Sequence, residues 1–186
     1  KIKNSKTILM NTAYPLMVGE ILLNDAKGNL DQAAEFLTKY GVYKLPETVI
    51  KSSGFGVMGS GFYGRSKGTI KSPYGTKNVE ADPEREIKLY PLKRLFNQSQ
   101  KEILSIDLKA CSKYKLTNEV IKNLTQIKFI YGAKDKLARF NNECELLINF
   151  DTDKDVTVID ETGHFPYFEN NIELNKLLLS LINDFN

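Results

Sequence analysis

The stretch VTVIDETGHFP, residues 156–166, decides the fold class of this chain. Its first four residues are apolar or β-branched, which is typical of a short buried strand, and the run stops at Asp160. His164, the single histidine of the chain, comes shortly afterwards. It precedes Pro166, a residue that suits the first turn of a helix. The stretch therefore predicts a strand, a loop that carries His164, and a helix.

A second run of the same kind, IKFIY at residues 127–131, stops at Gly132 about 30 residues earlier. Between the two runs, residues 136–150 carry apolar side chains at roughly helical spacing, namely Leu137, Phe140, Cys144, Leu147 and Ile148. We therefore expect a strand, a helix and a strand, which is a βαβ unit. The strands of such a unit are parallel and are buried on both faces.

Both ends of the chain add to this α/β core. The run TILM at residues 7–10 predicts a fully buried strand, which Asn11, Thr12 and the Tyr14-Pro15 pair bring to an end. At the other end, residues 167–185 predict a helix that packs back on the sheet. Its apolar stripe consists of Phe168, Ile172, Leu178, Leu181, Ile182 and Phe185.

The long middle of the chain differs in character and predicts a mostly helical insertion between strands of one sheet. Asn29, with Gln32 three positions later, is typical of a helix start, so we expect a helix over residues 30–40 that stops at Gly41. Residues 51–77 are rich in glycine and predict an irregular loop. Helical spacing returns over residues 91–113.

Composition excludes several classes of protein. The chain has 186 residues, of which 41% are apolar and 26% charged, as in ordinary globular proteins. No apolar run approaches the length of a membrane span. The net charge is only +3, and basic and acidic residues are interspersed, so the sequence shows no basic patch of the kind that binds nucleic acid. Two cysteines, Cys111 and Cys144, are too few for a disulfide framework, which favours a cytoplasmic setting. The chain opens at Lys1 without an initiator Met, so we expect a processed or truncated piece.

Two polar residues follow the predicted strands closely and form the candidate site. Asp135 lies in the loop after residues 127–131, and His164 lies in the loop after residues 156–159. Neighbouring parallel strands bring these loops together at the carboxyl edge of the sheet, where sites form in α/β proteins. A carboxylate beside an imidazole fixes its tautomer and stabilises the imidazolium. The alternative is that Asp135 caps the following helix and His164 is a surface residue, but the joint spacing favours a catalytic pair.

Other candidate sites are weaker. A single histidine cannot form a multi-histidine metal site, and we expect no metal. Residues 54–59 match the dinucleotide pattern G-x-G-x-x-G, but a poor helix start follows, so we expect no cofactor. Ser60 imitates the G-x-S-x-G nucleophile pattern only in part, because Met58 replaces the first glycine. Cys111 lies in a predicted helix, where a cysteine is more often a buried structural thiol than a nucleophile.

The chain resembles the carboxyl-terminal part of the α/β-hydrolase superfamily. The resemblance rests on residues 129–135 (FIYGAKD), on residues 156–165, and on Glu169 a little beyond. Residues 6–13 are similar to the strand that follows the nucleophile helix in that family, and residues 107–111 resemble part of an inserted helical cap. The implied fold is a partial parallel sheet, made of the last three strands, with a mostly helical cap. Its implied parts are a core strand at 1–15, the cap at 16–118 and the α/β core at 119–186.

The resemblance implies that Asp135 is the catalytic acid and His164 the general base. The family's nucleophile elbow, G-x-S-x-G, does not occur in this sequence. We therefore expect a hydrolase of ester, amide or related acyl-type bonds that is inactive without its nucleophile-bearing amino-terminal half, supplied by the same polypeptide or by a second chain. The expected substrate is a small molecule with an apolar portion. A non-catalytic, hydrolase-like protein that binds a ligand is the alternative.

Overall fold

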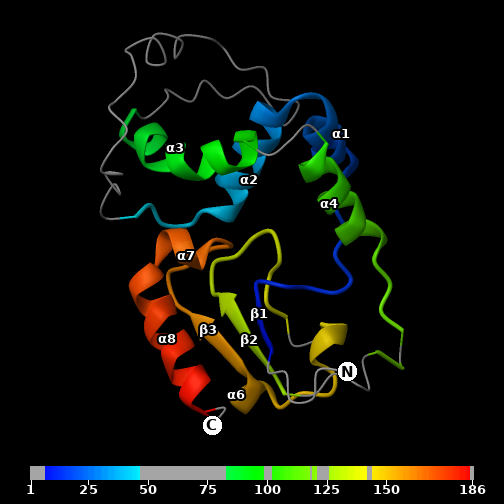
Figure 1. Cartoon of the computed structure of the whole chain (residues 1–186), viewed down its shortest axis with the longest axis vertical. Helices are drawn as coiled ribbons and strands as arrows, with labels where there is room; N and C mark the ends of the chain where they lie inside the picture. The colour runs from blue at the N-terminus through cyan, green and yellow to red at the C-terminus, as the bar shows by residue number, and fades with distance from the viewer. Residues whose placement is uncertain are drawn as a thin grey trace.

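The computed structural model describes residues 7–46, 83–98, 102–117, 119–120, 126–141 and 144–184. Its centre is a parallel sheet of three strands in the order β1-β2-β3, with β1 at Thr7–Met10, β2 at Ile127–Gly132 and β3 at Val156–Ile159 (Figure 1). Leu9 lies opposite Phe129, and Phe129 lies opposite Val156. All three expected strands and their parallel pairing are confirmed.

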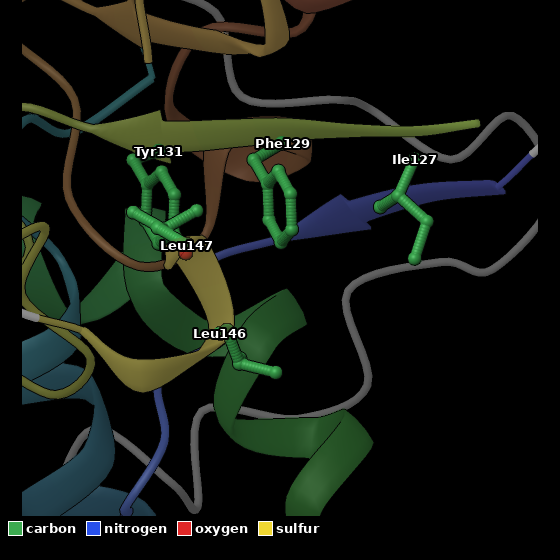
Figure 2. Packing of buried hydrophobic residues seen from close by; sticks show 5 residues of the cluster. All are labelled: Ile127, Phe129, Tyr131, Leu146 and Leu147. Carbon is green, nitrogen blue, oxygen red and sulfur yellow. The ribbon is translucent and has the colours of Figure 1, made fainter. Parts of the chain in front are cut away.

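The central strand β2 is covered on both faces. One face carries the buried cluster shown in Figure 2, made of Ile127, Phe129, Tyr131, Leu146 and Leu147. Ile130 points to the opposite face, where it joins Ile159 of β3 and two leucines of the last helix. The expectation of full burial is wrong for β1 and for β3. These strands lie at the two edges of the sheet, where Met10 is 41% and Val158 39% exposed.

The connection from β2 to β3 is not the expected helix over residues 136–150. Its described part consists of turns, the short 3-10 helix η2 at Glu145–Leu147, and the four-residue helix α6 at Thr152–Asp155. The apolar residues of this segment contact different partners, which explains why their helical spacing wrongly predicted a helix. Phe140 packs on the cluster of Figure 2. Leu137 packs against the helices that lie between β1 and β2 in the sequence, and Ile148 is 75% exposed.

The middle of the chain is helical where it is described, with α1 at Glu20–Gly28, α2 at Leu30–Gly41, α3 at Pro83–Gln98 and α4 at Ile103–Lys113. Helix α2 begins as expected, because the Asn29 side chain accepts a hydrogen bond from the amide of Gln32 at 3.3 Å. The sequence reasoning missed α1, and it placed the return of helical spacing at residue 91, whereas α3 begins at Pro83. The glycine-rich residues 51–77 lie outside the described residues. Figure 1 shows these four helices beyond the carboxyl ends of the strands.

An ion-pair bridge joins α2 to α3. The Lys93 ammonium lies 2.5 Å from Glu35 of α2 and 2.8 Å from Glu86 of its own helix. Burial lowers the pKa of Lys93, but the two carboxylates outweigh this effect and raise it above its ordinary value. The bridge therefore favours the charged ammonium and fixes the two helices side by side.

The carboxyl-terminal helix is divided in two, contrary to the expected single helix. Helix α7 spans Pro166–Glu169 and α8 spans Asn171–Asp184, with the break at Asn170. The residues of α8 that pack toward the sheet are Leu174, Leu177, Leu178 and Leu181. The expected stripe is thus partly wrong, since Ile172 and Ile182 are 69% and 52% exposed. Phe185 lies outside the described residues.

Candidate active site

The candidate site lies on two loops that leave adjacent parallel strands at the same edge. Asp135 follows β2, and His164 follows β3. Backbone hydrogen bonds join the loops directly, because the amide of Ala133 donates to the carbonyl of Ile159 at 2.9 Å and the amide of Lys134 donates to that of Thr162 at 2.8 Å. The loops therefore form one unit.

The structure brings the two predicted side chains into contact. His164 Nδ1 lies 2.8 Å from Asp135 Oδ2. The Asp135 side chain is fully buried, whereas the imidazole is 27% exposed. Because an ionised carboxylate only accepts hydrogen bonds, a neutral imidazole bonds to it through Nδ1–H, and Nε2 is then an acceptor.

Asp135 also has the structural role that was weighed as the alternative. Its Oδ1 accepts hydrogen bonds from the amides of Leu137 at 2.8 Å and Ala138 at 3.0 Å. It caps a turn rather than a helix, since residues 136–138 are not helical. Each carboxylate oxygen thus has its own partners, so the capping bonds hold the carboxylate in the orientation that the imidazole requires.

Glu169 is a buried carboxylate that bonds to the histidine loop, residues 160–165, which lies between β3 and α7. Its Oε2 accepts from the amides of Tyr43, Lys44 and Gly163 at 2.7, 3.0 and 3.0 Å, and its Oε1 accepts from the amide of Phe165 at 3.1 Å. The sequence placed Glu169 near the site only through a family resemblance. Gly163 and Phe165 lie only six and four positions before it, but Tyr43 and Lys44 lie more than 120 positions away, and no local sequence pattern indicates those two bonds.

Asn11 is a further site residue that the sequence reasoning treated only as a strand breaker. Its carboxamide donates to the carbonyls of Gly163 at 3.2 Å and His164 at 2.7 Å, and it accepts from the amide of Gly132 at 2.9 Å. Its φ angle is 45°, a left-handed conformation that asparagine tolerates better than most residues. An asparagine directly after an apolar strand run was the one available signal.

Glycines allow the loops to approach one another closely. A Cβ added to Gly132 would overlap the carbonyl oxygens of Gly163 and Thr162, and one added to Gly163 would overlap the carbonyl oxygen of Gly41. The amide of His164 also donates to that Gly41 carbonyl at 2.7 Å. The end of α2 and the ends of β2 and β3 therefore meet backbone to backbone beneath the histidine.

The remaining predicted candidates do not join this site. Cys111 lies in α4 as expected, but it is exposed rather than buried. Ser60 and residues 54–59 lie outside the described residues. In the part of the chain that the structure describes, no group of three or more His, Cys, Asp or Glu side chains is placed to hold a metal ion. No helix within the described ranges has the length and apolar content that a bilayer crossing needs.

No family model and no curated protein sequence matches this chain. Solved structures resemble 96% of it, among them the following two. A thermophilic esterase matches the chain with a TM-score of 0.58 at 18% sequence identity. The α/β hydrolase enzyme MGS-M2, from a Medee basin deep-sea metagenome library, matches it with a TM-score of 0.53 at 14% sequence identity. The chain spans 56% of the length of each. Likeness at such identities shows the fold alone, and the chain therefore has a partial α/β-hydrolase fold.

Proposed function

We propose that this chain is the carboxyl-terminal portion of a capped α/β-hydrolase that cleaves an ester, an amide or a related acyl-type bond. Asp135 is the acid and His164 the general base of its Ser-His-Asp triad. The observation that carries the proposal is the 2.8 Å contact between His164 Nδ1 and the buried Asp135 carboxylate. Residues 1–15 and 119–186 form its core, and residues 16–118 form the cap.

In the proposed reaction, Asp135 holds the imidazole in the tautomer that carries its proton on Nδ1. His164 Nε2 then takes the proton of a serine hydroxyl as that oxygen attacks the acyl carbonyl. The resulting imidazolium gives the proton to the leaving group. Water, activated by the same Nε2, finally releases the acyl group from serine.

The serine and the oxyanion donors come from the other part of the hydrolase in this proposal, because G-x-S-x-G does not occur in the sequence. Coverage of 56% of the similar structures supports such a missing part. The outer edge of β1 supports it too, because no strand among the described residues pairs with that edge, and an unpaired edge accepts another strand. The same polypeptide or a second chain supplies this part, and the chain alone is inactive.

The test is hydrolysis of p-nitrophenyl acetate by the 186-residue chain, alone and together with its nucleophile-bearing part. Alone, we expect no rate above buffer. Together, His164→Ala lowers kcat/KM by about a thousandfold or more, whereas Asp160→Asn, a change at an exposed neighbour, leaves it within about twofold. Equal activity of the His164 variant and the unchanged protein would refute the triad role.

A non-catalytic, ligand-binding relative of hydrolases is the second candidate, and the absent G-x-S-x-G pattern favours it. A fluorophosphonate probe separates the two candidates, because it reacts covalently only with an activated serine. Labelling of the nucleophile-bearing part, lost with His164→Ala, supports the hydrolase. An unlabelled protein that still binds apolar small molecules supports the non-catalytic, ligand-binding candidate.

A further inference from the structure

Asn11 lies where β1, β2 and the histidine loop meet, and the proposed reaction assigns it no step. It is the first residue after β1 and is 7% exposed. Its own amide donates to the carbonyl of Ile130 at 2.9 Å, which continues the pairing of β1 with β2. Its side chain bonds to Gly132 at the end of β2 and to residues 163 and 164 of the histidine loop.

We propose that Asn11 is a positioning residue, whose carboxamide holds the main chain of His164 at the spacing at which Nδ1 meets Asp135. The reason is geometric. Gly132 begins the turn that carries Asp135, since the amide of Asp135 donates to the carbonyl of Gly132 at 3.1 Å. Asn11 accepts from Gly132 with one end of its carboxamide and donates to the histidine loop with the other. In addition to the backbone bonds that join the loops, one planar group therefore ties the main chain of His164 to the residue that begins the Asp135 turn. The description of this pair as catalytic rests on the proposed function, but the positioning role does not.

Asparagine suits this position for two separate reasons. The site requires an acceptor for one amide and donors for two carbonyls, and a carboxamide supplies both on one rigid group. A carboxylate of the same shape has no donor, so it would face the carbonyls of Gly163 and His164 with oxygen. The backbone requirement is distinct, because φ at 45° favours glycine and asparagine. Glycine would satisfy the backbone without the carboxamide.

A consequence is that the imidazole depends on the edge strand. β1 contributes none of the residues of the His164–Asp135 pair, yet the position of Asn11 follows from the register of β1 on β2, in which Met10 lies opposite Ile130. A shift of β1 would move the carboxamide and thereby the carbonyl of His164. The placement of the edge strand is thus transmitted to the proposed general base.

The test uses NMR of the 186-residue chain, in which His164 is the only histidine. The ¹⁵N shifts of the imidazole report the tautomer without assignment, and exchange of the Gly132 amide reports the other end of the carboxamide. We expect the unchanged chain to hold the Nδ1–H tautomer. Asn11→Asp keeps the acceptor for Gly132 but removes both donors, so the tautomer shifts toward Nε2–H while the Gly132 amide stays protected.

Asn11→Gly keeps the backbone conformation and removes the whole group. We expect it to shift the tautomer and to speed exchange of the Gly132 amide by about tenfold. Asn29→Asp is the matched control, because the Asn29 side chain accepts a bond from Gln32 that aspartate can also accept. It leaves both signals unchanged.

An unshifted tautomer in Asn11→Gly overturns the proposal, whatever Asn11→Asp does. If Asn11→Asp fails to fold, the glycine variant alone decides. Unfolding of both variants under conditions in which Asn29→Asp is folded also overturns it, because Asn11 would then support the whole fold. These readouts need no catalysis, so failure of the proposed hydrolysis leaves the positioning role standing.

Discussion

The carboxylate of Glu169 accepts a hydrogen bond from the backbone amide of Tyr43 at 2.7 Å, across 126 positions of the chain. Glu169 closes α7, directly after the histidine loop, and Tyr43 follows α2. Three further amides donate to the same carboxylate. One buried side chain thus attaches the helices of the middle segment to the loop that carries His164.

Replacement of this carboxylate by an amide should destabilise the chain. Glu169→Gln retains one oxygen, and its amino group must face at least one of the four N–H donors, which loses its bond in a buried place. We expect the free energy of unfolding to fall by about 1–3 kcal/mol, measured by urea titration. Glu173→Gln, on the exposed surface of α8, is the control and should leave it unchanged. Equal effects of the two changes would contradict the bonding described for Glu169.

The close approach of the loops predicts an asymmetry between glycines. Gly132→Ala places a methyl group on the carbonyls of Gly163 and Thr162, which are backbone atoms and cannot rotate away. We expect a loss of about 3 kcal/mol in stability. Gly28→Ala, at the end of α1, meets nothing within 4 Å and should stabilise the chain by about 0.4–1 kcal/mol. Thermal unfolding of both variants checks the two signs, and a stable Gly132→Ala protein would refute the packing.

Asp135→Asn separates the two roles of the aspartate. Asparagine keeps an oxygen for the amides of Leu137 and Ala138, but it presents an amino group to His164 Nδ1. The imidazole then must accept at Nδ1, so we expect the Nε2–H tautomer in ¹⁵N spectra and little loss of stability. Asp160→Asn should leave the spectrum unchanged. The original tautomer in Asp135→Asn would show that the contact does not orient the ring.

Tyr131 should make stability decrease in alkali. Burial raises its pKa above the ordinary value of 10.0, and the nearby Cys144 and Asp135 add to the effect. The unfolded chain therefore loses the phenol proton at lower pH than the folded chain does. The tyrosine's contribution is complete below pH 10 and declines as the pH rises toward the folded value.

The comparison variant for this prediction is Tyr131→Phe, which also loses the hydrogen bond to the Thr12 carbonyl at 2.7 Å. We expect the unchanged chain to be more stable than the variant by about 1 kcal/mol near neutral pH, and this gap to shrink between about pH 10 and pH 12. Urea titrations at the two ends of that range measure it. A constant gap would contradict the prediction.

The sequence was sufficient for the strands and for the pair, because both depend on local signals. Short apolar runs that stop at Gly132 and Asp160 locate the ends of β2 and β3, and parallel pairing of neighbours then brings Asp135 to His164. These inferences need only the period of a strand and the geometry of a parallel sheet.

The connection between β2 and β3, by contrast, could not be predicted. Its apolar residues have helical spacing, but Phe140 and Leu137 reach different clusters and the backbone turns between them. The roles of Asn11 and Glu169 were hidden for a related reason. Both side chains bond to backbone groups, and every residue except proline offers the same amide, so the identities of their partners carry no sequence signal.

The bond from Asn11 to the His164 carbonyl joins positions 153 apart and therefore has a consequence for the order of folding. Contacts between distant positions form only after the intervening chain has been gathered, at a cost in loop entropy. Helices α1 and α2 are consecutive and need no such closure. In pulse-labelled hydrogen exchange during refolding, we expect the amides of α2 to gain protection before the amide of Gly132. The imidazole would then be fixed only once the first strand has joined the sheet.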